Sequence, residues 1–156
     1  MIKLSFKKMT PENIGSLAND IAETNVLENV VKEHKGVVFA LHDGEKYTAA
    51  SSMMFEMDDE VLTLALRKLY LSGLYISDKA DMGHDGMMLE YTADQASYMG
   101  YDLLTVRVSP DDMDRIKFFT AHGFDKIVKA DNDEQGGYLI LQRDIRVKIK
   151  CCGFYA

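Results

Sequence analysis

One stretch of the chain combines glycines, polar residues and a helical pattern in an order suited to holding an anion. Residues 78–86 are polar and include Gly83 and Gly86. Four apolar residues then follow at the spacing of one helix face: Leu89, Ala93, Ala96 and Met99. The first turn of a helix has unpaired backbone N–H groups and a positive dipole end, so a glycine-bearing loop before it can bind phosphate. An ordinary strand-to-helix connection gives the same pattern, and this stretch alone leaves both interpretations open.

Strands and helices on either side must position this loop. Residues 69–77 are rich in β-formers and apolar on both faces, which predicts a covered strand leading into the loop. A helix then follows over residues 86–99. A second apolar strand at residues 103–108 leads into a helix at residues 110–121, which begins with a capping-box-like pattern. Three further elements are predicted after it: a strand at residues 124–128, a polar turn at residues 132–137 and a long alternating strand at residues 138–150.

The first third of the chain predicts a strand, two helices and a hairpin. Residues 2–6 alternate between apolar and polar side chains, as a strand with one solvated face does. A helix is expected over residues 11–23, with a shorter one after it. Strands at residues 37–41 and 47–55 are joined by an Asp-Gly turn typical of a hairpin. Residues 58–68 fit either a strand or a helix, and we favour a strand that continues into the central one.

The composition indicates a folded, acidic protein with a single domain over residues 1–156. The chain is 47% hydrophobic and 28% charged, which suits one core of ordinary size. A formal charge of −7 argues against general binding of nucleic acid or anionic membranes, and no apolar run has membrane-spanning length. The cysteines Cys151 and Cys152 are adjacent, which suits neither a disulfide nor a zinc site. With no signal peptide in view, we expect a reduced, cytoplasmic protein without a bound metal.

Several short motifs follow one another along residues 69–128. They are the apolar strand end Leu74-Tyr75-Ile76, the loop glycine Gly83, the helix residues Leu89-Glu90 and 96–100, and the pairs Phe118-Phe119 and Gly123-Phe124. Together with the order of elements along the whole chain, they resemble the GNAT superfamily of acyl-CoA-dependent N-acyltransferases. The resemblance implies an α/β (α+β) fold, in which helices flank a mixed, mostly antiparallel central sheet with a splay between two strands.

The resemblance also implies that acetyl-CoA binds as co-substrate along the central strand and at the loop. The backbone of Leu74, Tyr75 and Ile76 would line the pantetheine arm, and the N–H groups of the loop would hold the pyrophosphate. The other residues implied for binding are Met82, Gly83, His84, Asp85, Gly86, Met87, Asp112 and Phe119.

Four positions depart from the GNAT pattern. Ala80 stands where the family has Arg or Gln, and Asp85 occupies the second small position of the loop, where its charge opposes a phosphate. A one-residue slip would instead place Gly86 there and turn Asp85 outward. Asp112 replaces the usual Asn, and Phe119 replaces the tyrosine that protonates the leaving thiolate in many members.

The reaction implied by the resemblance is attack of an amine on the thioester, which needs a base for the amine and an acid for the thiolate. Four acidic residues before the central strand are available as base, although a solvated turn also explains them: Glu56, Asp58, Asp59 and Glu60. Glu56 is our candidate. Tyr75 or His122 can supply the acid, unless Tyr75 packs in the core and His122 only ends a helix. His84 either replaces the missing cation of the loop or is exposed.

Two classes of function follow from this pattern. The first is an N-acetyltransferase that moves an acetyl group from acetyl-CoA to a primary amine of a small molecule or peptide. The second is a GNAT-shaped binding or regulatory module with weak or lost turnover, suggested by Ala80, Asp85 and Phe119. We expect the acceptor pocket to involve loops near residues 20–36 and 130–137.

The last predicted strand suggests an assembly. It alternates over residues 138–150, which is longer than the usual strand of about five or six residues. We expect its end, with residues 151–155, to pack against a second copy in a two-fold homodimer. The alternative is a tail that folds back over its own sheet.

Overall fold

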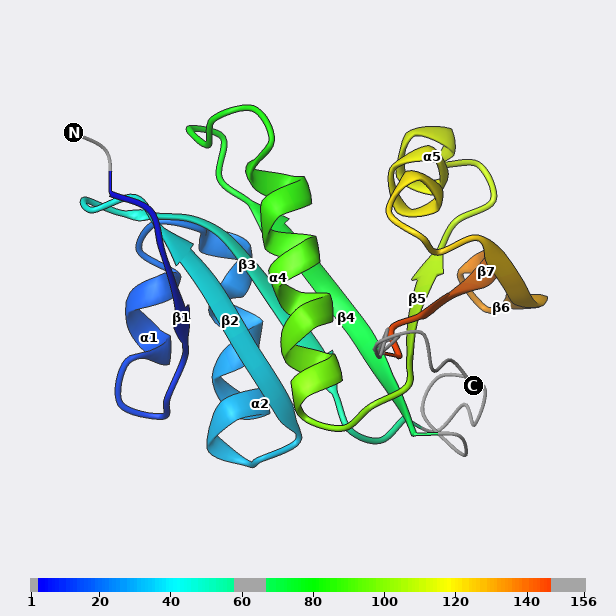
Figure 1. The fold of residues 1–156 in the computed structure, drawn as a ribbon, viewed down its shortest axis with the longest axis horizontal. Coiled ribbons are helices and arrows are strands. Elements are labelled where there is room, and N and C mark those ends of the chain that lie inside the picture. Colours follow the sequence, from blue (N-terminus) through cyan, green and yellow to red (C-terminus); the bar gives the residue numbers. More distant parts are fainter. Residues whose placement is uncertain (1–2, 58–66, 147–156) are drawn as a thin grey trace, which may run out of the picture.

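The computed structural model describes residues 3–57 and 67–146 (Figure 1). In this part of the chain, seven strands form one sheet in the order β1-β2-β3-β4-β5-β7-β6. Their bounds are Ser5–Lys8 (β1), Gly36–His42 (β2), Tyr47–Met54 (β3), Lys68–Ile76 (β4), Leu103–Val108 (β5), Lys126–Asp133 (β6) and Gly136–Asp144 (β7). Strands β4 and β5 run parallel, and the other neighbouring pairs described here are antiparallel. The mixed, mostly antiparallel sheet predicted from the sequence is confirmed.

Helices cover both faces of this sheet (Figure 1). Their bounds are Ile14–Leu17 (α1), Ala22–Leu27 (the 3-10 helix η1), Glu28–Lys32 (α2), His84–Tyr98 (α4) and Met113–Ala121 (α5). Helices α1, η1 and α2 pack on one face, and α4 packs on the other. None of the helices in the described residues is both long enough and apolar enough to cross a membrane.

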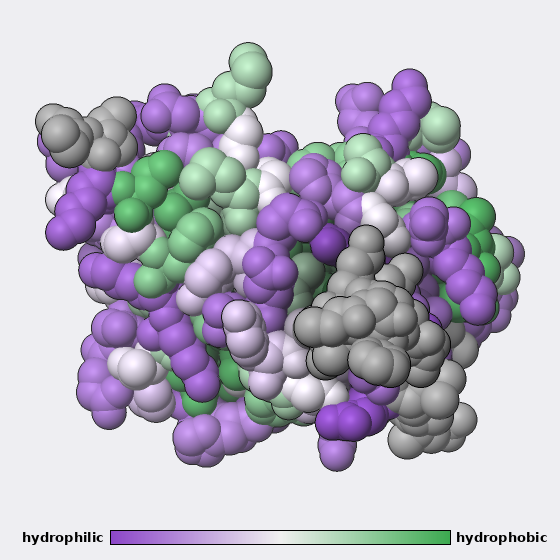
Figure 2. Space-filling model, in the orientation of Figure 1, coloured by the Kyte–Doolittle hydropathy of each residue, from purple (hydrophilic) through white to green (hydrophobic). Residues whose placement is uncertain are grey.

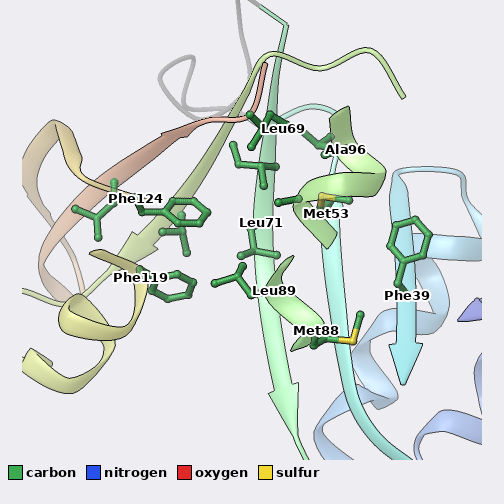
Figure 3. Close-up of a cluster of buried hydrophobic side chains, with 14 of the residues drawn as sticks. Phe39, Met53, Leu69, Leu71, Met88, Leu89, Ala96, Phe119 and Phe124 are labelled. Carbon is green, nitrogen blue, oxygen red and sulfur yellow. The ribbon is translucent and has the colours of Figure 1, made fainter. Parts of the chain in front are cut away.

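Strand β2 shows why the middle of the sheet is apolar on both faces. Val38 and Ala40 pack with the α1 and α2 side of the core, whereas Phe39 packs with the α4 side. Because successive side chains of a strand point to opposite faces, a strand covered twice needs apolar residues at every position. Figure 3 shows the α4 side of the core, where Met88 and Leu89 lie against the strands.

The two helices predicted after the central strand are confirmed. The helix expected at residues 86–99 is α4, and the one expected at residues 110–121 is α5. Asp112 is the N-cap of α5, and its carboxylate accepts the backbone N–H of Arg115 at 3.1 Å. The helix therefore begins three residues later than predicted, because its N-cap is the last residue of the predicted capping pattern rather than the first.

The single helix predicted over residues 11–23 is wrong. Helix α1 is four residues long and gives way to η1. Before α1, the side-chain oxygen of Asn13 accepts the N–H of Thr10 and holds a turn. After α1, the carboxylate of Asp20 accepts the N–H of Tyr47 on β3 at 2.9 Å. Asn and Asp side chains bond to the backbone outside helices, and here that preference outweighs the apolar stripe.

The last hairpin is tighter than the polar turn predicted at residues 132–137. Strands β6 and β7 remain paired as far as Asp133 and Gly136. Gly136 has a φ of +121°, which favours glycine, and the Asp133 carboxylate accepts the N–H of Gln135 at 2.9 Å. Strand β7 ends at Asp144, although the backbone N–H of Ile145 still bonds to the carbonyl of Asp102 just before β5. The last four residues of the predicted strand lie outside the described residues.

Some predictions fall on residues that the structure does not describe. Residues 58–66 include most of the ambiguous segment and three of the acidic candidates: Asp58, Asp59 and Glu60. Residues 147–156 include Cys151, Cys152 and the contact expected in a homodimer. Those expectations stay predictions.

Candidate functional site

Strand β4 pairs with β5 over its first residues and with β3 from Tyr70 onward, so both strands flank it only at Tyr70 and Leu71. Its parallel pairing with β5 stops after Leu71 and Val106, whereas its pairing with β3 continues to Ile76. Figure 1 shows β4 and β5 close together at one end and separating toward α5. We call this gap the splay. Residues 72–76 have one backbone edge directed at it, and an extended ligand can bond to such an edge like an added strand.

A β-bulge marks the point where the splay opens. Ser52 on β3 pairs with Gly73 and Met53 pairs with Leu71, which leaves Ser72 as an extra residue in β4. The Ser72 hydroxyl lies 2.6 Å from the hydroxyl of Ser52. A bulge bends its strand and increases the local twist, so it gives the second half of β4 a direction different from that of β5.

A cavity of about 380 Å³ lies between the second half of β4 and α5. Residues from three elements line it: Leu74 and Ile76 from β4, Asp85 from α4, and Arg115, Phe118 and Phe119 from α5. Asp114 adds a second carboxylate. Figure 2 shows a notch in the outline of the molecule between the start of α4 and α5. We call this space the splay cavity; it combines apolar walls with a few charged groups, as ligand sites do.

The start of α4 has the open backbone expected of an anion-binding loop. Gly83 is its N-cap, with a φ of +91° that favours glycine, and an added Cβ would meet no atom within 4 Å. Met82 and Met87 are exposed on either side. The carboxylate of Asp85, however, accepts the N–H of Gly86 at 2.7 Å and so takes one of the free donors of the first turn. Asp85 lines the splay cavity, so it is not turned outward as the slipped alignment expected.

Two histidines beside this loop are packed against other elements. His84 is buried, with Nδ1 3.0 Å from the hydroxyl of Thr48 on β3, so the expectation of an exposed side chain is wrong. His122, at the end of α5, lies over the first turn of α4. A Cβ added to Gly86 would be 3.1 Å from Cε1 of His122, so a glycine there lets the two helices approach.

A charged network ties α4, α5 and β7 together next to the splay cavity. Arg143 on β7 donates two hydrogen bonds to the carboxylate of Glu90 on α4, at 2.8 and 3.0 Å. Nδ1 of His122 lies 3.1 Å from the same carboxylate. The hydrogen bonds from Arg143, followed by the contact with His122, hold the pKa of Glu90 below its ordinary value. His122 is the C-cap of α5, and its role as an acid stays a prediction.

A second cavity, of about 310 Å³, lies beside β5 and the β6–β7 hairpin. Tyr70, Arg107, Asp133 and Tyr138 are among the residues that line it. The guanidinium of Arg107 stacks on the ring of Tyr138, 3.9 Å from its centre, and pairs with the Asp133 carboxylate. Because its neighbours along β5 belong to the α4 side of the core, Arg107 points to the opposite face of the sheet. We call this space the hairpin cavity.

Sequence reasoning did not select Tyr70 or Arg107. The sequence did offer one signal: a single arginine lies inside the otherwise apolar strand at residues 103–108. A charged side chain on a covered strand is rarely buried unless it has a partner. Burial raises the pKa of Tyr70, and the positive charges of Arg107 and Arg115 oppose that rise. Cations from β5 and α5 therefore both act on the Tyr70 hydroxyl.

No family model and no curated protein matches the sequence, but solved structures do match the fold. A GNAT-family protein from Desulfovibrio desulfuricans has a TM-score of 0.73 at 11% identity, over 92% of this chain and 99% of that one. The ribosomal-protein-S18-alanine N-acetyltransferase of Escherichia coli has a TM-score of 0.70 at 12% identity, over 99% and 100%. A GNAT acetyltransferase from Elizabethkingia anophelis, with acetyl-CoA bound, has a TM-score of 0.61 at 9% identity, over 90% and 97%. The chain has the GNAT fold.

The GNAT fold brings several of the residues expected for acetyl-CoA to one place. Leu74, Ile76, Asp85 and Phe119, far apart in the sequence, all line the splay cavity. Phe119 is 1% exposed and packs edge-on against neighbouring phenylalanines, which fixes its ring at the cavity wall. Asp112 caps α5 and is not among the residues that line the cavity.

The two residues chosen as catalytic from the GNAT pattern do not lie together. The ring of Tyr75 lies over Gly73, where an added Cβ would be 2.5 Å from the ring, and it packs against the α1 and α2 side of the core. Glu56 lines a third cavity, of about 560 Å³, together with His34 and Phe55 beyond the end of β3. Among described residues, that cavity shares no lining residue with the other two. Catalytic roles for Glu56 and Tyr75 stay predictions.

The described residues contain no group of three or more His, Cys, Asp or Glu side chains placed to hold a metal ion. The groups for chemistry at the splay include a backbone edge, a helix N-terminus, the carboxylates of Asp85 and Asp114 and the guanidinium of Arg115. Tyr70 and Arg107 line the hairpin cavity. Such a set suits the positioning of a reactive substrate and the movement of a proton.

Proposed function

We propose that the protein is an N-acetyltransferase, which moves an acetyl group from acetyl-CoA to a primary amine of a small molecule or peptide. The observation that carries this proposal is the splay, where residues 72–76 are paired with β3 alone and lie beside the splay cavity. A structure of the same fold from Elizabethkingia anophelis contains acetyl-CoA, which supports the choice of acyl donor. The donor supplies a thioester already activated toward an amine.

The residues of this chain fit such a donor in two respects and oppose it in one. The open edge of Leu74, Tyr75 and Ile76 can bond an extended pantetheine arm, and the space beside Gly83 is free for a pyrophosphate. Asp85 opposes the phosphates, because its carboxylate repels them and already accepts the N–H of Gly86. We therefore expect acetyl-CoA to bind weakly.

A binding or regulatory module without turnover is the second candidate. Two observations favour it: Asp85 occupies a donor at the start of α4, and Phe119 has no proton to give to a departing thiolate. We favour the enzyme, because acetyl transfer depends largely on positioning, and a missing acid lowers the rate more readily than it abolishes it.

Calorimetry with acetyl-CoA, followed by a thiol-release assay over a panel of amines, tests the proposal. We expect binding in the millimolar range or tighter, and release of coenzyme A with at least one amine. Binding without any turnover supports the module. No binding at millimolar acetyl-CoA, by either the natural protein or the Asp85→Gly variant, would exclude the acyl donor altogether.

A homodimer and a cytoplasmic location remain part of this proposal. The dimer contact is expected in residues 147–156, which the structure does not describe. Light scattering of the full chain and of a chain lacking residues 147–156 tests it. We expect a dimer that becomes a monomer on truncation, and a full chain that stays monomeric at high micromolar concentration would contradict it.

A further inference from the structure

Tyr70 stands at the closed end of the splay. It pairs with Thr105 on β5, one residue before the last pair that β4 and β5 make. The bulge at Ser72 follows directly, and beyond it β4 is open toward the splay cavity. Residues 72–76 span about 13 Å, so a ligand that lies extended along them from the start of α4 ends next to Tyr70.

The side chain of Tyr70 lies on the face of the sheet opposite Leu69 and Leu71, where it faces the hairpin cavity. The side chain is half-buried and lines the hairpin cavity with Arg107 and Tyr138. Within the described part of the chain, no hydrogen bond engages its hydroxyl. Burial raises its pKa, so the phenol keeps its proton at neutral pH and has that proton available to donate.

The charged groups around Tyr70 favour a transient phenolate. Arg107 from β5 and Arg115 from α5 both lower the pKa of Tyr70 against the effect of burial, whereas Tyr75 on the same strand has a weak opposite effect. Arg107 is held in place by the ring of Tyr138 and by Asp133 on β6. Burial outweighs the two cations, so the pKa of Tyr70 stays above its ordinary value, and the cations reduce the cost of forming the phenolate.

We propose that Tyr70 is the proton donor for the sulfur of the departing coenzyme A, in place of the acid that Phe119 cannot supply. This inference rests on the proposed function. The amine nitrogen bonds to the carbonyl carbon, and the carbon–sulfur bond breaks with its electron pair going to sulfur. The proton of the Tyr70 hydroxyl moves to that sulfur, and the phenolate regains a proton from the acceptor nitrogen through water. The products are the acetylated amine and coenzyme A in its thiol form.

The first test needs no acceptor amine. Coenzyme A is bound to the protein and titrated with base while the ultraviolet absorbance of its thiolate is recorded. A hydrogen bond from Tyr70 stabilises the thiolate, so we expect Tyr70→Phe to raise the pKa of the bound thiol by about one to two units. Tyr91→Phe is the matched control, because Tyr91 on α4 is also half-buried with a raised pKa but stacks on Phe6 away from the splay. It should leave the thiol pKa unchanged.

The second test measures turnover with acetyl-CoA and the most active amine of the panel. We expect Tyr70→Phe to lower kcat by about a hundredfold with little change in the KM for acetyl-CoA, and Tyr91→Phe to change neither. Arg115→Met is a further variant that leaves the tyrosine intact; it should raise the thiol pKa by a smaller amount. These variants keep the idea testable if Tyr70→Phe folds poorly.

The outcomes separate this inference from the proposed function. If Tyr70→Phe shifts neither the bound thiol pKa nor kcat while the natural protein turns over, the inference is overturned and the proposed function stands. If Tyr70→Phe and Tyr91→Phe lower kcat equally, the effect is structural and the inference is again overturned. If the natural protein does not bind acetyl-CoA in calorimetry, the proposed function fails first.

Discussion

The two halves of strand β4 share one neighbour and differ in the other, and the difference makes the candidate site. In the first half, Leu71 is paired on both edges and Leu69 with β5, and both are essentially unexposed. Leu74 and Ile76 in the second half are just as apolar, yet Ile76 is 37% exposed beside the splay cavity. The same kind of residue thus builds the core in one half and the wall of a cavity in the other. Strand pairing, rather than residue type, separates the two roles.

The core next to the splay explains how the halves can differ without loss of stability. Leu69 and Leu71 belong to the same cluster as Phe119 and Phe124, which Figure 3 shows beyond β4 on the α5 side. This cluster buries the apolar side chains of the first half of β4 and packs them against α5 and β5. The second half is paired only with β3, so its other backbone edge is available for a ligand.

The largest expected effect comes from truncating one leucine of the closed half. We expect Leu71→Ala to lower the free energy of unfolding by about 3 kcal/mol, because it leaves a cavity in a fully packed cluster. Ile76→Ala, in the open half, should cost less than about 1 kcal/mol and instead weaken the binding of acetyl-CoA. Urea unfolding and calorimetry measure the two quantities. Equal losses of stability would mean that the halves do not differ in the way described.

A smaller effect is expected where the open half leads into α4. We expect Asp85→Gly to tighten the binding of acetyl-CoA by about 1 kcal/mol, roughly fivefold in Kd, because it removes a repelling charge and frees the N–H of Gly86. Asp85→Asn is the control, since it removes the charge and keeps an oxygen that can accept the N–H. Calorimetry at two salt concentrations separates the two contributions. No gain with either variant would show that phosphates do not bind here.

The smallest effect concerns the network that fixes α5 beside the splay. The pKa of Glu90 is held below its ordinary value of 4.5, so its pairing stabilises the folded protein above that pH and is lost as the pH falls through the folded-state pKa. We expect Glu90→Gln to lower the free energy of unfolding near neutral pH by less than about 1 kcal/mol, because the carboxylate is half-exposed and screened by solvent. The difference from the natural protein should vanish in acid. Urea unfolding as a function of pH tests this, and a difference that persists in acid would assign the effect to packing.

Local signals in the sequence predicted the elements that lie along one strand or one helix. The stripe from Leu89 to Ala96 predicted α4, and the residues around Asp112 predicted a helix at α5. Gly83 was expected in the loop before α4, and the structure makes it the N-cap of that helix. Each of these signals depends on the spacing of side chains over a few neighbouring residues, or on the φ angle that one residue can adopt. The same reasoning failed for residues 11–23, because Asp20 bonds to a strand more than twenty residues away.

The sequence by itself determined the order of the elements, the apolar faces they bury and the loop that precedes α4. Only the tertiary structure decided where β4 leaves β5, that His84 is buried against Thr48, and that the charges of Arg107 and Arg115 act on Tyr70. The physical reason is the range of the interactions. Periodicity and turn conformation are set by neighbours in the chain, whereas strand pairing, burial and the charges around a hydroxyl depend on residues that meet only after the sheet has formed.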